Sequence, residues 1–488
     1  MAFAITQNCC NDASCLSVCP VNCIHPTPDE PDFGKTDLLH IDPRACIDCG
    51  ACADACPVEA ITRVSRLTPE QAIYADVNAA YYENHPGEHV WDAPKFPPPS
   101  IRNLGELQVA IVGTGPAACY AAQALLRTAD AKVTFFDRLP LPGGLARFGV
   151  APDHTGTRRI GEHFRALFTH PRVTMRLGVE VGKDVGHAEL AERYDSVVYA
   201  VGADVDRTWD LPGTELSGSV SARTLVGWYT GHPDVPADAV DLDGVERVVI
   251  VGNGNVALDA ARILTADPED LAGSEIASHA LRALRTSVIR EVVVCARRGP
   301  EHAAFTRSEC QALVTRPGVS VVVAGEDDRA STIDALPITA PASALKGAAS
   351  VSLGSEPGPG ERRIVFAFGQ IPVALDGPGR VTAVDLGAGV SIDAQLVLRA
   401  IGYQGSALPG VPFDDVRGTF DNIAGRVTGL DRTYVVGWAK RGANGGIGDN
   451  RADAEETVHH LVNDALARPV VGAATRRLDR VRNRNRST

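Results

Sequence analysis

The most specific chemical signal in the sequence is a run of four cysteines, Cys46, Cys49, Cys52 and Cys56, followed by Pro57. This is the C-x2-C-x2-C-x3-C-P spacing of bacterial iron–sulfur loops, in which three thiolates hold one cluster and the fourth holds another. A structural zinc site usually divides its ligands into two separated pairs, and a disulfide framework needs no such spacing. The run therefore predicts iron–sulfur clusters and electron transfer.

A shorter version of this pattern stands upstream, where Cys15, Cys19 and Pro20 repeat its C-x3-C-P ending. The repeat indicates an internal duplication in which each half lends its last cysteine to the other cluster. The predicted ligands of one cluster are Cys19, Cys46, Cys49 and Cys52. Those of the other are Cys15, Cys56 and either Cys9 or Cys10. Because the first half lacks the full triplet, we expect a 3Fe–4S cluster there in preference to a second 4Fe–4S cluster.

A glycine-rich turn, Gly113-Thr-Gly115-Pro-Ala-Ala118, follows a short apolar run at 109–112 and precedes a helix-like stretch. It fits G-x-G-x-x-A, in which the glycines allow a tight turn and a close approach of pyrophosphate at the helix N-terminus. A second apolar run ends at Asp137, where a carboxylate can accept a hydrogen bond from a ribose hydroxyl. The unit predicts a dinucleotide site, and the acid favours FAD or NAD over NADP.

The same pattern of an apolar run and a glycine-rich turn occurs again at Gly252-Asn-Gly254-Asn-Val-Ala257, after the apolar run 247–251. A later apolar run ends at Arg297 and Arg298. A guanidinium can hold a 2′-phosphate with two parallel hydrogen bonds, so this second unit favours NADP over NAD. An exposed basic pair without a ligand is the alternative interpretation.

The 488 residues carry a formal net charge of −13, which argues against general nucleic-acid binding. We expect the Arg-rich C-terminal tail at 471–488 to be solvated. The sequence has no signal-peptide pattern, and no run approaches the ~18 apolar residues of a membrane span. Clustered thiols without an export signal predict the reducing cytoplasm.

These patterns predict an α/β protein with two Rossmann-like nucleotide-binding domains and a small α+β iron–sulfur domain. The expected segments are a two-cluster domain at 1–65, a proline-containing linker at 66–105, the first part of the FAD domain at 106–215, the NADP domain at 216–394, the second part of the FAD domain at 395–470 and a basic tail at 471–488.

Longer stretches resemble known families. The segments 137–154, 197–202 and 437–447 closely resemble adrenodoxin reductase-type ferredoxin–NADP reductases, and the likeness covers about 106–465. The first 65 residues resemble seven-iron bacterial ferredoxins. That resemblance favours Cys9 over Cys10 as a ligand and implies that Cys23 lies near a cluster without binding it. The gap from Cys9 to Cys15 is shorter than in that family, so the choice stays open.

The reductase resemblance implies roles for individual residues. The FAD set is Gly113, Gly115, Ala117, Asp137, Leu145, Val181, Trp438, Gly445, Gly446 and Ile447, of which the last four cover the flavin ring. The NADP set is Gly252, Gly254, Asn255, Val256, Arg297, Arg298, Glu309 and Gly445. Asp153 and His154 match a pair near the flavin, which suggests a proton route. The chain departs from the family at Ala443-Asn444, where Pro-Thr is usual.

The expected reaction follows from the cofactors. NADPH gives two electrons together as a hydride, a cluster accepts one, and FAD connects the two. We therefore expect a reductase that passes electrons from NADPH through FAD and its own clusters to ferredoxin or a cytochrome, reversibly in principle. The alternatives are an electron-transfer subunit of a glutamate synthase-type complex and, from a non-enzyme class, an iron–sulfur redox sensor.

Overall fold

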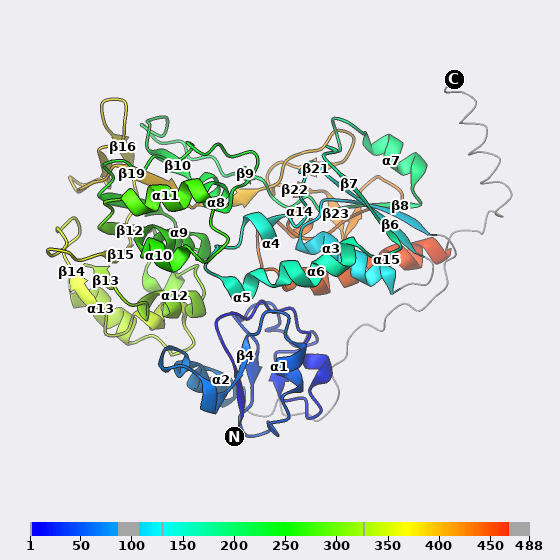
Figure 1. Cartoon of the computed structure of the whole chain (residues 1–488), viewed down its shortest axis with the longest axis horizontal. Coiled ribbons are helices and arrows are strands. Elements are labelled where there is room, and N and C mark those ends of the chain that lie inside the picture. The colour runs from blue at the N-terminus through cyan, green and yellow to red at the C-terminus, as the bar shows by residue number, and fades with distance from the viewer. Residues whose placement is uncertain (1, 86–106, 128–130, 326, 468–488) are drawn as a thin grey trace.

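The computed structural model describes residues 2–85, 107–127, 131–325 and 327–467. Two α/β lobes lie side by side, and the small N-terminal unit lies against both of them (Figure 1). Each lobe is built on a seven-stranded sheet. The predicted fold class, two Rossmann-like domains with a small α+β unit, is confirmed.

The N-terminal unit contains two short antiparallel strand pairs and the helices α1 (Ala51–Ala55) and α2 (Ile73–Asn84). β1 (Phe3–Ile5) pairs with β4 (Ile61–Arg63), and β2 (Ile24–His25) pairs with β3 (His40–Ile41). Helix α1 carries Cys52. The cysteine-bearing loops connect these elements, so the small sheets hold both halves of the predicted duplication together.

Helix α2 (Ile73–Asn84) corrects the prediction that 66–105 is a linker. Its Asn78 accepts hydrogen bonds from the backbone N–H groups of Ile5 (3.1 Å) and Ile41 (2.8 Å). Tyr82 donates its hydroxyl proton to the carbonyl oxygens of Cys23 and His40. The helix thus belongs to the N-terminal unit, because its polar side chains complete the edges of both strand pairs. The proline run of the predicted linker lies outside the described residues.

The first lobe has the strand order β23-β24-β25-β8-β5-β6-β7. Its strands are β5 (Gln108–Val112), β6 (Lys132–Asp137), β7 (Val173–Leu177), β8 (Ser196–Tyr199), β23 (Asn422–Ile423), β24 (Arg426–Val427) and β25 (Thr433–Val435). The pairs from β25 to β7 are parallel, as expected for strands that are apolar and buried. Helix α3 (Pro116–Leu126) packs against α15 (Asp449–Ala467), which brings the end of the described chain back to the first glycine loop.

The second lobe has the strand order β10-β19-β11-β12-β15-β13-β14, and every pair is parallel. Its strands are β10 (Ser219–Ser221), β11 (Arg247–Val251), β12 (Glu291–Ala296), β13 (Ser320–Ala324), β14 (Ala349–Val351), β15 (Arg363–Phe368) and β19 (Leu396–Arg399). Helices α8 (Ala222–Thr230), α9 (Asn255–Thr265) and α12 (Arg307–Val314) contribute residues to the cleft described below, and α11 (Ser278–Thr286) packs against α8.

Strand β19 corrects the predicted boundary at residue 394. It lies between β10 and β11 and pairs in parallel with both. The strand therefore belongs to the second lobe, and the chain returns to the first lobe only after Arg399. Sequence order did not reveal this, because a crossover joins strands that are distant in sequence.

Short strand pairs and small helices complete the lobes. The strands are β9 (Val205–Asp206) with β20 (Tyr403–Gln404), β21 (Phe413–Asp414) with β22 (Thr419–Phe420), and β16 (Ala374–Asp376) with β17 (Ala383–Asp385) and β18 (Ser391–Asp393). The helices are α4 (Leu145–Phe148), α5 (Thr155–Arg158), α6 (Ile160–Phe168), α7 (His187–Arg193), α10 (Pro268–Leu271), α13 (Asp327–Asp334) and α14 (Trp438–Arg441). Among the described helices, none combines the length and apolar character needed to cross a bilayer. The basic tail at 471–488 lies outside the described residues.

Candidate functional site

Both glycine loops open into one cleft of about 1480 Å³. The loop at 443–447 lines the same cleft, as do Cys9, Cys10, Asn11 and the segment 34–37 of the N-terminal unit. The loops follow the carboxyl ends of parallel strands, which is where α/β sheets bind their ligands. The structure thus brings the two predicted nucleotide sites and the cysteine-bearing loop to one cavity.

The first glycine loop requires glycine at the point of closest approach. Gly113 has φ +106°, and a Cβ there would lie 2.4 Å from the carbonyl oxygen of Ala200. Gly115 precedes α3 as its N-cap residue, and Ala117 lies buried in the first turn. The turn therefore leaves the start of α3 open to the cleft, which fits a pyrophosphate at a helix N-terminus.

Asp137 ends β6 at the cleft, as predicted. Thr114 donates its hydroxyl proton to Oδ2 over 2.5 Å, and the backbone N–H of Leu139 donates to Oδ1 over 2.9 Å. These bonds orient the carboxylate and leave it acceptor capacity for a ribose hydroxyl. Leu145 and Val181 also line the cleft.

The loop predicted to cover the flavin ring is held from both sides. Trp438 donates its indole N–H to the carbonyl oxygen of Gly445 over 3.0 Å. Asp449, at the start of α15, accepts from the N–H of Gly446 over 2.5 Å. Ile447 follows in the same loop and lines the cleft. The glycine turn, the oriented carboxylate and this fixed loop together fit a flavin dinucleotide.

The second glycine loop repeats the geometry of the first. Gly252 has φ +118°, and a Cβ there would lie 2.2 Å from the carbonyl oxygen of Ala400. Gly254 is the N-cap residue of α9. Asn255 accepts a hydrogen bond from the N–H of Thr306 over 2.7 Å, which ties the loop to the start of α12. This arrangement fits a second dinucleotide.

Arg297 and Arg298 directly follow β12 and line the cleft together with Val256. Both arginine side chains are exposed. Within the described part of the chain, neither guanidinium forms a salt bridge with a carboxylate. Two guanidiniums at the mouth of the second nucleotide site, both without an internal anion, fit a 2′-phosphate.

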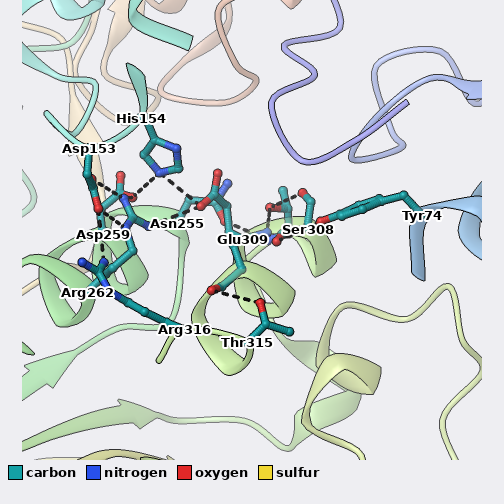
Figure 2. Close-up of polar contacts among 12 residues, drawn as sticks. Tyr74, Asp153, His154, Asn255, Asp259, Arg262, Ser308, Glu309, Thr315 and Arg316 are labelled. Carbon is teal, nitrogen blue, oxygen red and sulfur yellow. Dashed lines mark hydrogen bonds and ion pairs between the residues drawn. The ribbon is translucent and has the colours of Figure 1, made fainter. Parts of the chain in front are cut away.

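Figure 2 shows a network of charged side chains where the segment with Asp153 and His154 meets helices α9 and α12. His154 Nε2 lies 3.0 Å from Asp259 Oδ1 and 3.3 Å from Glu309 Oε2. Arg262 donates to the Asp259 carboxylate over 2.7 Å and lies 3.5 Å from Glu309. His154, Asp259 and Glu309 are close enough together to hold a metal ion. Because Arg262 already pairs with both acids, we interpret the cluster as an ion-pair network.

The network holds His154 in its charged form. Burial alone would lower the pKa of His154, and the charge of Arg262 acts in the same direction. Glu309 and Asp259 outweigh both and raise the pKa of His154 to about 10. The imidazolium therefore keeps its proton at neutral pH.

The structure argues against the predicted proton route through Asp153. Both of its carboxylate oxygens are bound by Arg262, over 2.7 and 3.0 Å, and Arg316 lies 3.3 Å away. Burial would raise the pKa of Asp153, but Arg262 outweighs it and lowers that pKa to about 2. Asp153 is also not among the residues that line the cleft. An ionised Asp153 held by Arg262 and a protonated His154 are poor partners for a proton relay at neutral pH, and the role of this pair stays a prediction.

The cysteines fall into two neighbouring groups. Burial raises the pKa of Cys15, and the thiols of Cys9 and Cys56 raise it further. Burial also raises the pKa of Cys10, with smaller effects from Asp12, Cys9 and Cys56. Four thiols thus lie together where the sequence predicts three ligands. Of the two candidate ligands, Cys9 is the one whose thiol affects the pKa of Cys15. That Cys9 and not Cys10 is the ligand stays a prediction.

The second group contains the remaining predicted ligands. Burial and the thiols of Cys19 and Cys46 raise the pKa of Cys52 to about 12. Cys23 Sγ lies 3.5 Å from Cys19 Sγ, and hydrogen bonds from Cys23 lower the pKa of Cys19 to about 6 and that of Cys46 to about 5. Cys49 is exposed. Two sets of converging thiols have the donor chemistry for two clusters, with Cys23 beside one set.

The N-terminal unit is attached to both lobes by hydrogen bonds. Asp37 Oδ2 accepts from the N–H of Arg307 over 2.5 Å, and Tyr74 donates its hydroxyl proton to the carbonyl oxygen of Ser308 (Figure 2). On the other lobe, the N–H of Gly448 donates to the carbonyl oxygen of Cys10 over 2.8 Å. The unit therefore sits at the cleft with its cysteine-bearing loop toward the predicted flavin site.

Two family models match the chain. The pyridine nucleotide-disulphide oxidoreductase model matches residues 107–321, and the 4Fe-4S binding domain model matches residues 39–62. The second match contains the run from Cys46 to Cys56. It supports one 4Fe–4S cluster and leaves the second cluster as a prediction.

A relative from Mycobacterium bovis, a probable ferredoxin/ferredoxin–NADP reductase, is 45% identical over an alignment of 486 residues that covers 95% of this chain and 84% of the relative. The chain belongs to the ferredoxin/ferredoxin–NADP reductase family. A mitochondrial NADPH:adrenodoxin oxidoreductase of Arabidopsis thaliana is 37% identical over 399 residues, 73% of this chain and 82% of the relative. The solved structure of Mycobacterium tuberculosis FprA in complex with NADPH matches with a TM-score of 0.67 and 41% identity, over 74% of this chain and 85% of FprA.

This ferredoxin/ferredoxin–NADP reductase is an oxidoreductase, and its predicted likeness to adrenodoxin reductases is confirmed. The match to FprA extends over 74% of the chain, whereas the match to the M. bovis relative extends over 95%. The M. bovis relative thus shares more than the two lobes.

Sequence reasoning did not find several residues of this region. They are charged members of the network around Asp153 and His154 and the residues that attach the N-terminal unit: Asp259, Arg262, Arg316, Asp37, Tyr74, Gly448 and Arg451. Asp259 and Arg262 could have been noticed as charges within the otherwise apolar helix α9. The others carry no local signal.

Proposed function

We propose that the chain oxidises NADPH and passes the electrons, through FAD and the iron–sulfur clusters of its own N-terminal unit, to a ferredoxin-type one-electron carrier. Overall, one NADPH and two oxidised carriers give one NADP⁺, one proton and two reduced carriers. When bound, FAD supplies the exchange between two-electron and one-electron chemistry. The reverse direction is open where the reduction potentials allow it.

One observation carries this proposal. Cys9 and Cys10 line the same cleft as both dinucleotide loops, and Cys10 is hydrogen-bonded to Gly448 directly after the flavin-covering loop. A cluster held beside these residues would lie next to the flavin ring without any movement of the N-terminal unit. An electron-transfer subunit that needs a partner is less well supported, since the chain matches a reductase over 84% of that relative's length.

The residues of the chain bind and orient the reactants in this proposal. The Gly113 turn and Asp137 hold the pyrophosphate and ribose of FAD, and Leu145, Val181 and the 445–447 loop enclose its ring end. Arg297 and Arg298 hold the 2′-phosphate of NADPH, which selects it over NADH. Thr114 and the N–H of Leu139 orient Asp137, and Trp438 and Asp449 hold the 445–447 loop, so these parts of the flavin site are preformed.

The charged network acts as a fixed electrostatic environment. Asp259 and Glu309 keep a proton on His154 Nε2. A permanent cation beside the nicotinamide would disfavour the positive charge that develops on that ring when hydride leaves. Glu309 and Asp259 offset this effect with negative charge at the same place. The balance tunes hydride transfer in either direction.

For the N-terminal unit we propose a 4Fe–4S cluster held by Cys19, Cys46, Cys49 and Cys52 and a 3Fe–4S cluster held by Cys9, Cys15 and Cys56. The lack of a C-x2-C-x2-C triplet in the first half supports three cysteine corners in the second cluster. We also propose a reducing compartment such as the cytoplasm, because nine of the 12 cysteines cluster in the first 56 residues, where thiolates can hold clusters instead of pairing with one another.

The proposal is tested on the purified full chain under anaerobic conditions. We expect one FAD and seven irons per chain, bleaching of the flavin by NADPH, and cluster reduction without any added protein. Turnover with a ferredoxin or a cytochrome as acceptor should need no companion subunit. Flavin that is reduced by NADPH while the clusters stay oxidised would contradict the proposal, provided that dithionite reduces those clusters.

A further inference from the structure

The two cysteine groups are not equivalent in their distance from the flavin side of the cleft. Cys9, Cys10 and Asn11, from the first group and its loop, line the cleft. None of the four predicted ligands of the other group is among the lining residues. The first group is therefore the one that faces the predicted flavin site.

The contact between the loop at 9–14 and the first lobe is close and directional. The N–H of Gly448 donates to the carbonyl oxygen of Cys10 over 2.8 Å, and a Cβ on Gly448 would lie 1.9 Å from that oxygen. Arg451, one helical turn further along α15, donates to the carbonyl oxygen of Asp12 (3.1 Å) and to the hydroxyl of Ser14 (2.8 Å). Only glycine at position 448 allows this approach.

The same loop is also tied to the second lobe through the N-terminal unit. Asn11 donates its amide to the carbonyl oxygen of Thr36 over 2.9 Å, and the neighbouring Asp37 binds the N–H of Arg307. The loop that carries Cys9 and Cys10 is thus held on both sides of the cleft. Such bracing favours a fixed position for the metal centre that this loop supports.

The second group lies toward solvent. Cys49 is exposed, and the neighbouring Ile47 keeps 56% of its surface accessible. The groups adjoin one another, because helix α1, which carries Cys52, packs against the 3-10 helix Leu16–Val18, which directly follows Cys15. An electron can therefore pass from one group to the other within the unit and then reach the surface.

From this arrangement we infer the order of the relay: the cluster of Cys9, Cys15 and Cys56 receives electrons from the flavin, and the cluster of Cys19, Cys46, Cys49 and Cys52 delivers them to the external carrier. The inference rests on the proposed function. The oxidation of each NADPH supplies two electrons to the relay and releases one proton to solution. The two electrons pass singly through the first cluster, then the second, and reduce two carriers.

The decisive variant is Gly448→Ala in the full chain, because its Cβ pushes the cluster loop away from the flavin side and removes no ligand. Gly161→Ala is the matched control, since a Cβ there meets nothing within 4 Å. Iron, sulfide and flavin contents are measured first. Stopped-flow absorbance then follows flavin reduction by NADPH, and freeze-quench EPR follows each cluster through its own signal.

We expect flavin reduction to stay within twofold of the parent in Gly448→Ala, while reduction of both clusters slows at least tenfold. In the parent chain, the EPR signal of the Cys9 cluster should change before that of the Cys46 cluster. Dithionite should reduce both clusters fully in every variant. If Gly448→Ala loses flavin or iron, Arg451→Gln replaces it, since it removes the hydrogen bonds to Asp12 and Ser14, together with the ion pairs to Asp12 and Glu455, and no cluster ligand.

The outcomes separate the two claims. Parent clusters that NADPH cannot reduce, although dithionite can, would overturn the proposed function. Clusters that NADPH reduces in the opposite order, or at the parent rate in both Gly448→Ala and Arg451→Gln, would overturn only the relay order. A chain with a single cluster would also overturn the order, while leaving NADPH oxidation intact.

Discussion

The ion-pair network around His154 allows a quantitative prediction. Replacing Glu309 with Gln removes a negative charge 3.3 Å from His154 Nε2 and leaves Asp259 in place. With an effective dielectric constant of about 20, a full charge at that distance contributes about 5 kcal/mol. Observed shifts from one neighbouring charge are about 1–3 pKa units. The pKa of His154 should therefore fall from about 10 by that amount and enter the range of pH 7 to 9.

The sign of the rate effect follows from the reaction. The pKa of His154 is raised above its ordinary value, so in the parent chain the imidazolium persists until the pH approaches about 10. Below that pH the rate of flavin reduction by NADPH should show no inflection from this group. In Glu309→Gln, His154 loses its proton as the pH rises through 7 to 9. The rate should then increase, because a nearby cation no longer opposes the positive charge that forms on the nicotinamide.

The assay is stopped-flow flavin reduction at saturating NADPH between pH 5.5 and 9.5. Glu275→Gln is the matched control, because it removes an equal charge from an exposed side chain that pairs with Arg158 instead. The double variant His154→Gln/Glu309→Gln should lose the inflection and so assign it. An inflection near pH 6.5 in the parent chain would refute the reasoning, as would a flat profile in Glu309→Gln.

Three further predictions concern the nucleotide sites and the fold. Changing Arg297 and Arg298 to Ser should lower the preference for NADPH over NADH by about ten- to hundredfold, because charge-assisted hydrogen bonds contribute about 1.5–3 kcal/mol; the ratio of kcat/KM values measures this. Gly113→Ala should yield protein with little bound flavin, since its Cβ would lie 2.4 Å from the Ala200 carbonyl oxygen; the flavin released on denaturation is the readout. Glu291→Gln leaves buried Arg363 without its carboxylate partner and Arg247 with Glu356 alone, and should cost about 3–5 kcal/mol of stability, seen as a lower urea midpoint.

The parts that the sequence predicted correctly are those encoded within a few neighbouring residues. A glycine with positive φ between a buried strand and a helix is a local requirement, and both Gly113 and Gly252 meet it. The proximity of the cysteines within each group followed from the duplication of a short motif. Strand β6 ends at Asp137 for the same reason, since the pattern of apolar residues stops there.

The missed features depend on residues that are far apart in the sequence. Asp153 and Arg262 are separated by 109 positions, and their ion pair exists only because α9 packs beside the loop before α5. Strand β19 belongs to the sheet of the second lobe and not to that of the first, because crossover connections, and not sequence order, decide which strands pair. Helix α2 was hidden by the polar and aromatic composition of its segment, whose side chains turned out to face the N-terminal strands through Asn78 and Tyr82.

Helix α12 connects the two halves of the mechanism. Asp37 of the N-terminal unit accepts from the N–H of Arg307 in its first turn, and Tyr74 binds the next residue. Burial raises the pKa of Asp37, while the N–H groups of this turn lower it, so the helix end supplies the partners that the acid needs. Glu309 projects from the same turn toward His154. Because one helical turn holds both contacts, the docked position of the N-terminal unit and the charge balance at the nicotinamide side are mechanically linked. A change that separates the N-terminal unit from α12 should therefore alter the charge environment of His154.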